Sequence, residues 1–559
     1  MMAVVLQLLL FLGVIFGFAA SQNCPIHGPA YPAVQNISKS VVFETAKETF
    51  DKILADALES GQLDNTTSTF SIAVFSIDSD DLIYEFHQTG ADQNITVNSD
   101  SLYRIGSISK LITVYTILSK LSDKYWDESV TKYVPELSAL PAPESPLDGV
   151  DWSEVTLGGL ASHMTGIGRD YALGDLSATL PGQTVLPGLP PLNDTEIVRC
   201  GSNGYRPCTR EEAFTKLLTK PTVIPPYQGA IYSNVAFQLL AYAVENITGE
   251  FFSSIVESEL LTPLNLTRTF LTQPTNDTNA VIVDGWDLDI GEEGPAGAYY
   301  QALSDLSTLG KSILLSSIIP PFQTRKWFHP TSHTSSLSVS VGRPWEIFRE
   351  KINTTTTSNK TRVIDLYTKS GGIQSYISHL ALSPDHGLGI SFLSGNGGQN
   401  TFFYLQEKLY NAWFGSAEAI MRNEAENRFG GVYKGSDNST VEFKLDDTGE
   451  PGLLLSGLIS NGTDLLEVFG QAFGLPEGVK LGGWLYPMGR DARTGKVAFR
   501  AVFGALGVES GEEKCLSWAG VDQLRYGGHA IDLFVFEVEE GKEKAGSVRV
   551  EGLKKVFER

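Results

Sequence analysis

The stretch RIGSISKLITVYTIL, residues 104–118, restricts the fold most, because the positions after Lys110 are almost all apolar. A helix with so little polar surface must be buried in a large core. A desolvated lysine loses part of its preference for the charged form, so it needs neighbours that share its proton or balance its charge. We therefore expect distant parts of the chain to supply such neighbours.

Ser107 and Ser109 compete as the partner of Lys110. Ser107 lies three residues before the lysine, so both side chains fall on one helix face, whereas the side chain of Ser109 is turned away by about 100°. A neutral Lys110 can take a proton from Ser107, and a charged one can stabilise a nearby anion. Ser-x-x-Lys occurs by chance in many chains, so the pattern alone does not identify a catalytic pair. The alternative is a serine at the start of a helix, followed by a lysine whose side chain extends toward water.

Two later patterns carry matching chemistry. In IYSNVAF, Tyr232 offers a phenol that can act as general base and later as general acid, and Asn234 can orient a substrate carbonyl or the lysine. The alternative is a helix cap beside a packing tyrosine. In YTKSGGIQSYISHL, Lys369 adds a positive charge, and a glycine-bearing strand edge can present a backbone N–H to an oxyanion. The alternative there is an ordinary edge strand with glycines.

The order of Ser-x-x-Lys, Tyr-x-Asn and Lys-Ser-Gly resembles the serine β-lactamase and penicillin-binding protein family. The tyrosine makes the chain similar to the branch with class C β-lactamases, D-alanyl-D-alanine peptidases and family VIII esterases. The flanking segments WDESVTKYVPEL, TLGGLASHMTGIGRD, PYQGAIYSNVAFQLL and GPAGAYYQALSDL resemble the same family, so the resemblance covers about residues 40–415.

This resemblance implies an α+β fold, with an antiparallel sheet flanked by helices and an additional helical lobe. It implies Ser107 as the nucleophile, with Lys110 and Tyr232 sharing the base and acid steps. The residues that it implies for orienting the substrate and stabilising its oxyanion are Asn234, Lys369, Ser370, Gly371 and Gly372, and the backbone N–H groups of Ser107 and Gly372 would form the oxyanion hole. Gly372 stands where β-lactamases often have serine, which argues against a β-lactam substrate.

The chain divides into three predicted parts. Residues 1–21 are predicted to be a signal peptide, because a short apolar core ends at the small residues Ala19, Ala20 and Ser21. Residues 22–420 are the predicted catalytic domain. From 425 to 559, alternating segments such as TVEFKLDD and IDLFVFEVEE predict an all-β domain, which resembles the accessory domain of fungal family members.

Glycosylation and cysteine patterns favour a secreted protein. Asn-x-Ser/Thr acceptors occur at Asn36, Asn65, Asn94, Asn193, Asn246, Asn265, Asn276, Asn353, Asn359, Asn438 and Asn461. Four cysteines suit an oxidising compartment. Cys200 and Cys208 are the best disulfide candidates, because the glycine and proline between them permit a tight loop, and Cys24 and Cys515 then remain to pair. Four cysteines nevertheless allow three connectivities.

Composition and missing motifs exclude other classes. A net charge of −23 argues against nucleic acid as a partner, and no second apolar run is long enough to span a bilayer. Eight histidines show no metal-site pattern, so we expect no metal and no cofactor. His163 is expected to fix a loop by hydrogen bonds. No Gly-x-Ser-x-Gly elbow occurs, which argues against an α/β-hydrolase.

We therefore expect a secreted serine hydrolase or acyltransferase that acts on a small ester, amide or thioester through an acyl-serine intermediate. The alternatives are a biosynthetic acyltransferase of secondary metabolism and a non-catalytic binding descendant of the fold. Retention of Ser107, Lys110 and Tyr232 favours an enzyme.

Overall fold

The computed structural model describes residues 25–34, 37–64, 66–138, 140–145, 147–179, 188–202, 205–275, 277–355, 360–491, 494–507, 516–539 and 541–559. Several predictions concern residues outside these ranges: the signal peptide, the pair Cys24 and Cys515, and the acceptors Asn36, Asn65, Asn276 and Asn359.

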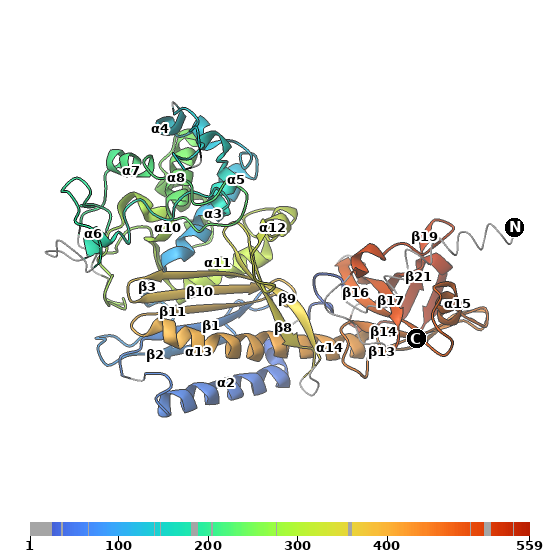
Figure 1. The fold of residues 1–559 in the computed structure, drawn as a ribbon. Helices are drawn as coiled ribbons and strands as arrows, with labels where there is room; N and C mark the ends of the chain where they lie inside the picture. Colours follow the sequence, from blue (N-terminus) through green and yellow to red (C-terminus); the bar gives the residue numbers. More distant parts are fainter. Residues whose placement is uncertain are drawn as a thin grey trace.

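An eight-stranded antiparallel sheet forms the centre of the larger domain (Figure 1). Its strand order is β2-β1-β11-β10-β9-β8-β7-β6. The first strand pairs with the last one in sequence, and Phe70 lies opposite Ser394. The strands are β1 Phe70–Ser76, β2 Tyr84–Gln88, β6 Ser332–His333, β7 Val339–Val341, β8 Glu346–Asn353, β9 Thr361–Ile373, β10 Tyr376–Ser383 and β11 Leu388–Ser394.

Helices α2 (Val41–Glu59), α13 (Gly398–Tyr410) and α14 (Ser416–Phe429) cover one face of this sheet (Figure 1). Ser40 caps α2, because its side chain accepts a hydrogen bond from the backbone of Val42. The ring of Phe50 in α2 packs 5.8 Å from that of Tyr84 on the sheet and 5.9 Å from that of Trp413. Aromatic side chains therefore hold these helices against the sheet.

A helical lobe covers the other face (Figure 1). The helix predicted from residue 107 is α3, Ser109–Leu121, preceded by a 3₁₀ turn at Gly106–Ile108, and its residues from Ser109 to Leu118 are all buried. The other helices are α4 Pro135–Ser138, α5 Leu157–Ala161, α6 Leu176–Thr179, α7 Arg210–Leu217, α8 Val235–Thr248, α9 Phe252–Val256, α10 Gly294–Gly297, α11 Leu303–Leu315 and α12 Pro321–Trp327. A small sheet of β3 Leu102–Arg104, β4 Thr269–Phe270 and β5 Tyr300–Ala302 joins the lobe to the centre.

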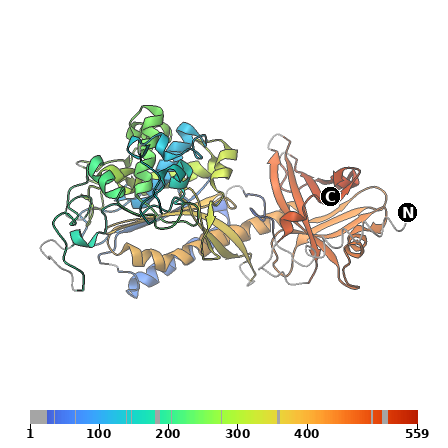
Figure 2. The ribbon, with the colours of Figure 1, turned by 45° about the horizontal axis from the view of Figure 1, so that its top comes forward.

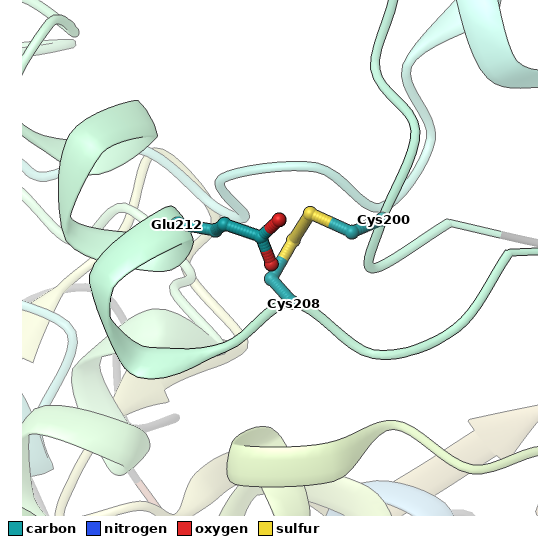
Figure 3. A group of neighbouring side chains, drawn as sticks. All are labelled: Cys200, Cys208 and Glu212. Carbon is teal, nitrogen blue, oxygen red and sulfur yellow. A yellow bond between two sulfur atoms is a disulfide. The ribbon is translucent and has the colours of Figure 1, made fainter.

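Cys200 and Cys208 form a disulfide, so this predicted pairing is confirmed (Figure 3). The carboxylate of Glu212 lies beside the two sulfur atoms. Both sulfurs are used in the bond to each other, and Glu212 is held by Arg206 at 2.7 Å and closes the capping box of α7 with Thr209. These three residues therefore stabilise a loop and are not arranged to bind a metal.

The C-terminal strands form a separate nine-stranded sheet (Figure 2). Strand β13 pairs with both β12 and β14, which closes most of the sheet into a barrel. Its strands are β12 Gly431–Lys434, β13 Thr440–Leu445, β14 Leu453–Ser460, β15 Thr463–Asp464, β16 Leu481–Asp491, β17 Lys496–Ala505, β20 Leu533–Glu537, β21 Ser547–Val550 and β22 Lys555–Glu558. Strands β18 Arg525–Tyr526 and β19 His529–Ala530 make a short separate hairpin.

The expected fold class is confirmed: an α+β domain with an antiparallel sheet and a helical lobe, followed by a β-rich domain. One helix interrupts the β domain, α15 at Leu465–Ala472, because the side chain of Asp464 caps its first turn. In the described part of the chain, no helix has both the length and the apolar character needed to cross a membrane.

Candidate active site

Ser107 lies in the short turn between β3 and α3, which is pressed against strand β9. A Cβ atom on Gly371 would lie 2.0 Å from the carbonyl oxygen of Ile105 and 2.9 Å from the backbone nitrogen of Ser107. Gly106 has a φ of +47°, and a Cβ on it would lie 2.7 Å from the nitrogen of Gly372. Glycine on both sides therefore allows the backbones of the turn and the strand to touch.

The amine of Lys110 donates three hydrogen bonds in the core. Its Nζ lies 3.1 Å from Oγ of Ser107, 2.7 Å from Oδ1 of Asn234 and 2.7 Å from the carbonyl oxygen of Ala296. The side chain is fully buried, and burial, together with the charge of Lys369, lowers the pKa of Lys110. In the neutral form its two N–H bonds suit Asn234 and Ala296, which leaves the lone pair for Ser107.

Tyr232 is the second ionisable group at Ser107, and its hydroxyl donates to Oγ of Ser107 at 2.7 Å. Burial raises the pKa of the phenol, but the charges of Lys110 and Lys369 lower it more, to about 8. The ring of His163 stacks on the tyrosine with centroids 4.4 Å apart.

His163 fixes this loop by hydrogen bonds, as expected. Its Nδ1 accepts from the backbone of Ser233 at 3.1 Å, and its carbonyl oxygen accepts from Ile231 at 2.8 Å. Burial and the nearby lysines Lys110 and Lys369 hold the pKa of His163 well below its usual range, so the imidazole is neutral. A neutral ring is consistent with Nδ1 acting as the acceptor.

Lys369 lies beside Tyr232, with its Nζ 5.4 Å from the centre of the phenol ring. Burial lowers the pKa of Lys369, but the carboxylate of Glu346, to which it donates, raises it above the ordinary value. Ser370 faces the other side of strand β9, because successive side chains alternate. Its hydroxyl is 3.0 Å from Nδ1 of His379, and it does not line the cleft described below.

Asn234 links Lys110 to a carboxylate. While Oδ1 accepts from the lysine, Nδ2 donates to Oδ1 of Asp170 at 2.8 Å. Both ends of the amide are therefore fixed, which leaves one N–H for a ligand. Burial raises the pKa of Asp170, although the bond from Asn234 opposes this effect.

A cleft of about 230 Å³ opens beside Ser107. Gly372, Asn234 and Ser107 form part of its wall. The remaining lining residues are Arg169, Leu173, Leu288, Ile290, Glu293, Ala296, Gly297, Ile373 and Gln374. The site thus combines a serine that contacts two ionisable groups with a small space for a substrate, lined by both polar and apolar residues.

Comparison with known proteins agrees with this geometry. Residues 57–408 match the β-lactamase family, and residues 421–559 match a domain described as "Beta-lactamase-like-like, C-terminal domain". The chain belongs to the β-lactamase family.

Three relatives illustrate this membership. A β-lactamase-like protein of Arthroderma benhamiae is 30% identical, with 93% of each chain covered. The "Probable hydrolase M10" of a Phoma species is 25% identical over 76% of this chain and 71% of its own length. The "Probable hydrolase clz13" of Cochliobolus lunatus is 26% identical over 83% of this chain and 77% of its own length.

Sequence reasoning missed three acidic residues of this β-lactamase-family site. Asp170 lies behind Asn234, Glu346 binds Lys369, and Glu293 lines the cleft. Asp170 is the last residue of the family-like segment TLGGLASHMTGIGRD, and this position was the only feature of the sequence that could have pointed to a role in the site. The other two come from a turn and from a neighbouring strand, where no spacing distinguishes them from surface carboxylates.

The predicted glycosylation acceptors within the described residues are all exposed. They are Asn94, Asn193, Asn246, Asn265, Asn353, Asn438 and Asn461. Exposure is what the modification requires, since a glycan is bulky and hydrophilic.

Proposed function

We propose that this protein is a serine hydrolase that cleaves a small ester or amide through an acyl-enzyme on Ser107. One observation carries the proposal: Lys110 and Tyr232 both lie within hydrogen-bond distance of Oγ of Ser107, at 3.1 and 2.7 Å. A serine hydroxyl is a weak nucleophile unless an adjacent base removes its proton. Two such groups on one hydroxyl, at the edge of a cleft, are what this chemistry needs.

In the first half of the reaction, Oγ of Ser107 bonds to the acyl carbon while its proton passes to the pair formed by Lys110 and Tyr232. The bond from the acyl carbon to the leaving oxygen or nitrogen then breaks, and the pair returns the proton to that atom. The phenol of Tyr232 can both take up and return this proton, because its pKa is lowered to about 8, near neutral pH. In the second half, the oxygen of a water molecule bonds to the acyl carbon while the pair takes one proton from that water. The bond from the acyl carbon to Oγ of Ser107 then breaks, the pair returns the proton to Oγ, and a carboxylic acid leaves.

The negative oxygen that forms during both halves needs donors that are already in place. The close contact between the turn of Ser107 and strand β9 supports the backbone N–H groups of Ser107 and Gly372 as these donors. Glycine at 372 supplies no side chain, so donation there depends on the backbone alone.

Secretion and glycosylation belong to the same proposal. The disulfide Cys200–Cys208 and the exposed acceptor asparagines support a protein made in an oxidising secretory compartment. Mass spectrometry of the protein from its natural source, before and after removal of N-glycans, tests this part.

The catalytic proposal is tested by covalent labelling. An alkyl fluorophosphonate should add to Ser107 with loss of fluoride, and the mass of the peptide containing residue 107 should rise accordingly. Ser107→Ala should remove both the adduct and the hydrolysis of phenyl esters. Adding a short alcohol to the ester assay shows whether acyl transfer competes with hydrolysis.

Ser109→Ala is the matched control. The hydroxyl of Ser109 is buried, donates to the carbonyl oxygen of Gly106 at 2.7 Å and accepts from the backbone of Tyr299 at 3.2 Å. Its loss should lower stability by about 1–3 kcal/mol, the cost of leaving a buried group unpaired, but the adduct should still form. If labelling persists in Ser107→Ala, or depends on Ser109 instead, the assignment of the nucleophile is wrong.

A further inference from the structure

Glu293 lies in the wall of the active-site cleft and is only 6% exposed. It ends the 3₁₀ turn Gly291–Glu293, directly before α10. The carbonyl oxygens of the next residues are tied to α3, since Pro295 accepts from Thr113 at 2.8 Å and Ala296 accepts from Lys110 at 2.7 Å. The backbone that carries Glu293 is therefore held against the helix of the catalytic lysine.

The carboxyl of Glu293 has no protein partner among the described residues, as no hydrogen bond or ion pair to it is found there. Other buried carboxylates of the chain are paired: Asp532 with Arg500, and Glu418 with Arg362. Buried polar groups in folded proteins almost always have partners. The carboxyl of Glu293 is an exception among these described residues, and because it lines a cleft, a bound ligand can supply the missing partner.

The surroundings of Glu293 keep it protonated near neutral pH. Burial and the charge of nearby Asp170 raise the pKa of Glu293 to about 8, although Lys110 and Lys220 act in the opposite direction. A protonated carboxyl can donate one hydrogen bond through its O–H. The apolar side chains of Leu288 and Ile290 line the same cleft and offer no acceptor.

We infer that Glu293 determines specificity by donating a hydrogen bond to an oxygen atom in the acyl group of the substrate. The preferred substrate would then be an ester or amide whose acyl chain carries an ether, hydroxyl or carbonyl oxygen. The inference rests on the proposed function, because it takes Ser107 as the atom that receives this acyl group.

The acyl half is assigned to Glu293 for a geometric reason. The leaving group must depart beside Tyr232, which returns its proton, and Arg169 lies over the ring of that tyrosine at 4.7 Å. Glu293 and Ser107 line the same cleft, and the acyl group is the part of the substrate that stays bound to Ser107. The acyl group therefore remains in the cleft with Glu293 after the leaving group has departed.

Pairs of esters that differ by one atom test this inference. Phenyl 3-methoxypropanoate and phenyl pentanoate have the same chain length, and the first replaces one methylene with an acceptor oxygen. Phenyl methoxyacetate and phenyl butanoate move that oxygen one atom closer to the carbonyl. Each kcat/KM is divided by the rate of hydrolysis in hydroxide, which removes the intrinsic difference in reactivity.

The wild type should prefer the ether ester of at least one pair by about fivefold or more, the value of a typical hydrogen bond. Glu293→Leu should remove that preference, and Glu293→Gln, which keeps a neutral donor, should retain it. Glu292→Gln is the matched control, because Glu292 is exposed and does not line the cleft, and the preference should stay as in the wild type.

Two results would overturn the inference: equal rates for both members of each pair in the wild type, or an unchanged preference in Glu293→Leu. The second result includes an equal loss of activity on ether and alkyl esters in Glu293→Leu, a pattern that indicates a structural role. Failure of the wild type to cleave any of the four esters, or cleavage that survives Ser107→Ala, would instead contradict the proposed function.

Discussion

Strand β9 carries two buried cations in contrasting surroundings, Arg362 near its start and Lys369 near its end. Arg362 donates to both carboxylate oxygens of Glu418, at 2.7 and 2.8 Å, and to Asp385 at 2.9 Å. Burial opposes the charge of Arg362, but these carboxylates raise its pKa, and in turn the guanidinium lowers the pKa of Glu418 to about 2. Every charge in this cluster is stabilised by its neighbour.

The cluster around Lys369 contains a conflict. Glu346 balances Lys369, but Lys110 lies close enough for the two lysines to disfavour each other's charge. Burial and the charge of Lys369 lower the pKa of Lys110, and the charges of Lys110 and Lys369 outweigh burial to lower the pKa of Tyr232. Matched charges favour one protonation state and hold structure, whereas conflicting charges bring a proton near the point of transfer.

The two clusters also have different tasks in the fold. Glu418 belongs to α14, which runs from beneath the central sheet to the C-terminal domain (Figure 1). In the same region, Thr354 donates to the carbonyl oxygen of Gly449 at 2.7 Å, and Lys360 pairs with Glu450 at 3.0 Å. The cluster of Arg362 therefore fixes the sheet beside the second domain, while the cluster of Lys369 includes the two groups that contact Ser107 in the cleft wall.

The largest expected effect comes from removing the phenol of Tyr232. Tyr232→Phe keeps the ring that stacks on His163 but deletes the hydroxyl at Ser107. We expect kcat/KM for phenyl esters to fall by about 10²–10⁴, the usual contribution of a general acid–base group. Thermal unfolding should change by less than about 1 kcal/mol. If Tyr232→Phe lost stability as well as activity, the cluster of Lys369 would also have a structural role, and the two clusters would not differ in the way described above.

Breaking the matched cluster should have the opposite signature. Arg362→Met leaves the buried carboxylate of Glu418 without its main partner, which costs about 3–5 kcal/mol in comparable cases. Activity per folded molecule should stay near the wild-type value. The free energy of unfolding in urea and the kcat/KM of the folded fraction measure both effects.

Arg349→Met is the control for Arg362→Met. Arg349 lies on the neighbouring strand and pairs with Asp365 at 3.3 Å, but its side chain is 46% exposed. Because surface ion pairs contribute about 0–1 kcal/mol, this variant should be nearly as stable as the wild type. Equal destabilisation by both substitutions would mean that burial does not govern the contribution of these pairs.

Sequence patterns locate the reactive half of this comparison but not the structural half. Ser107 and Lys110 share a helix face by spacing alone, and the Tyr232 segment follows a recognisable order. The pairing of Arg362 with Glu418 joins a strand to a helix far along the chain, and neither residue stands in a motif. Contacts of this kind depend on tertiary packing, which local periodicity does not encode.

Some details of the site depend on packing as well. Helical spacing favours Ser107 over Ser109, yet only the structure shows why Ser109 is needed, as a bridge between Gly106 and Tyr299. Within the Lys-Ser-Gly pattern, Lys369 lies beside Tyr232, whereas the hydroxyl of Ser370 lies 3.0 Å from Nδ1 of His379. Strand alternation could have predicted that the two side chains face opposite ways; the partner of each could not be predicted.

The smallest predicted effect is a difference in pH dependence between the activity, which depends on the cluster of Lys369, and the stability contributed by the cluster of Arg362. Burial raises the pKa of Tyr232, but Lys110 and Lys369 bring it down to about 8, and the reactive form of the Lys110–Tyr232 pair is the one that has lost a proton. We therefore expect kcat/KM to fall about tenfold per pH unit below pH 8. Glu418 has a lowered pKa, so the stability that it contributes is present above its ordinary pKa of 4.5 and is lost only as the pH falls toward 2. The contribution of Glu418 to the free energy of unfolding should therefore hardly change between pH 6 and 9.

Glu293 complicates this measurement, because its pKa is also raised to about 8. Glu293→Gln removes that titration and should keep the acidic limb, since the limb belongs to the pair of Lys110 and Tyr232. The profile is best recorded with phenyl butanoate, whose acyl chain offers Glu293 no oxygen acceptor. A limb that vanishes in Glu293→Gln would assign the titration to the cleft wall, and a flat wild-type profile would contradict the conflict of charges around Lys369.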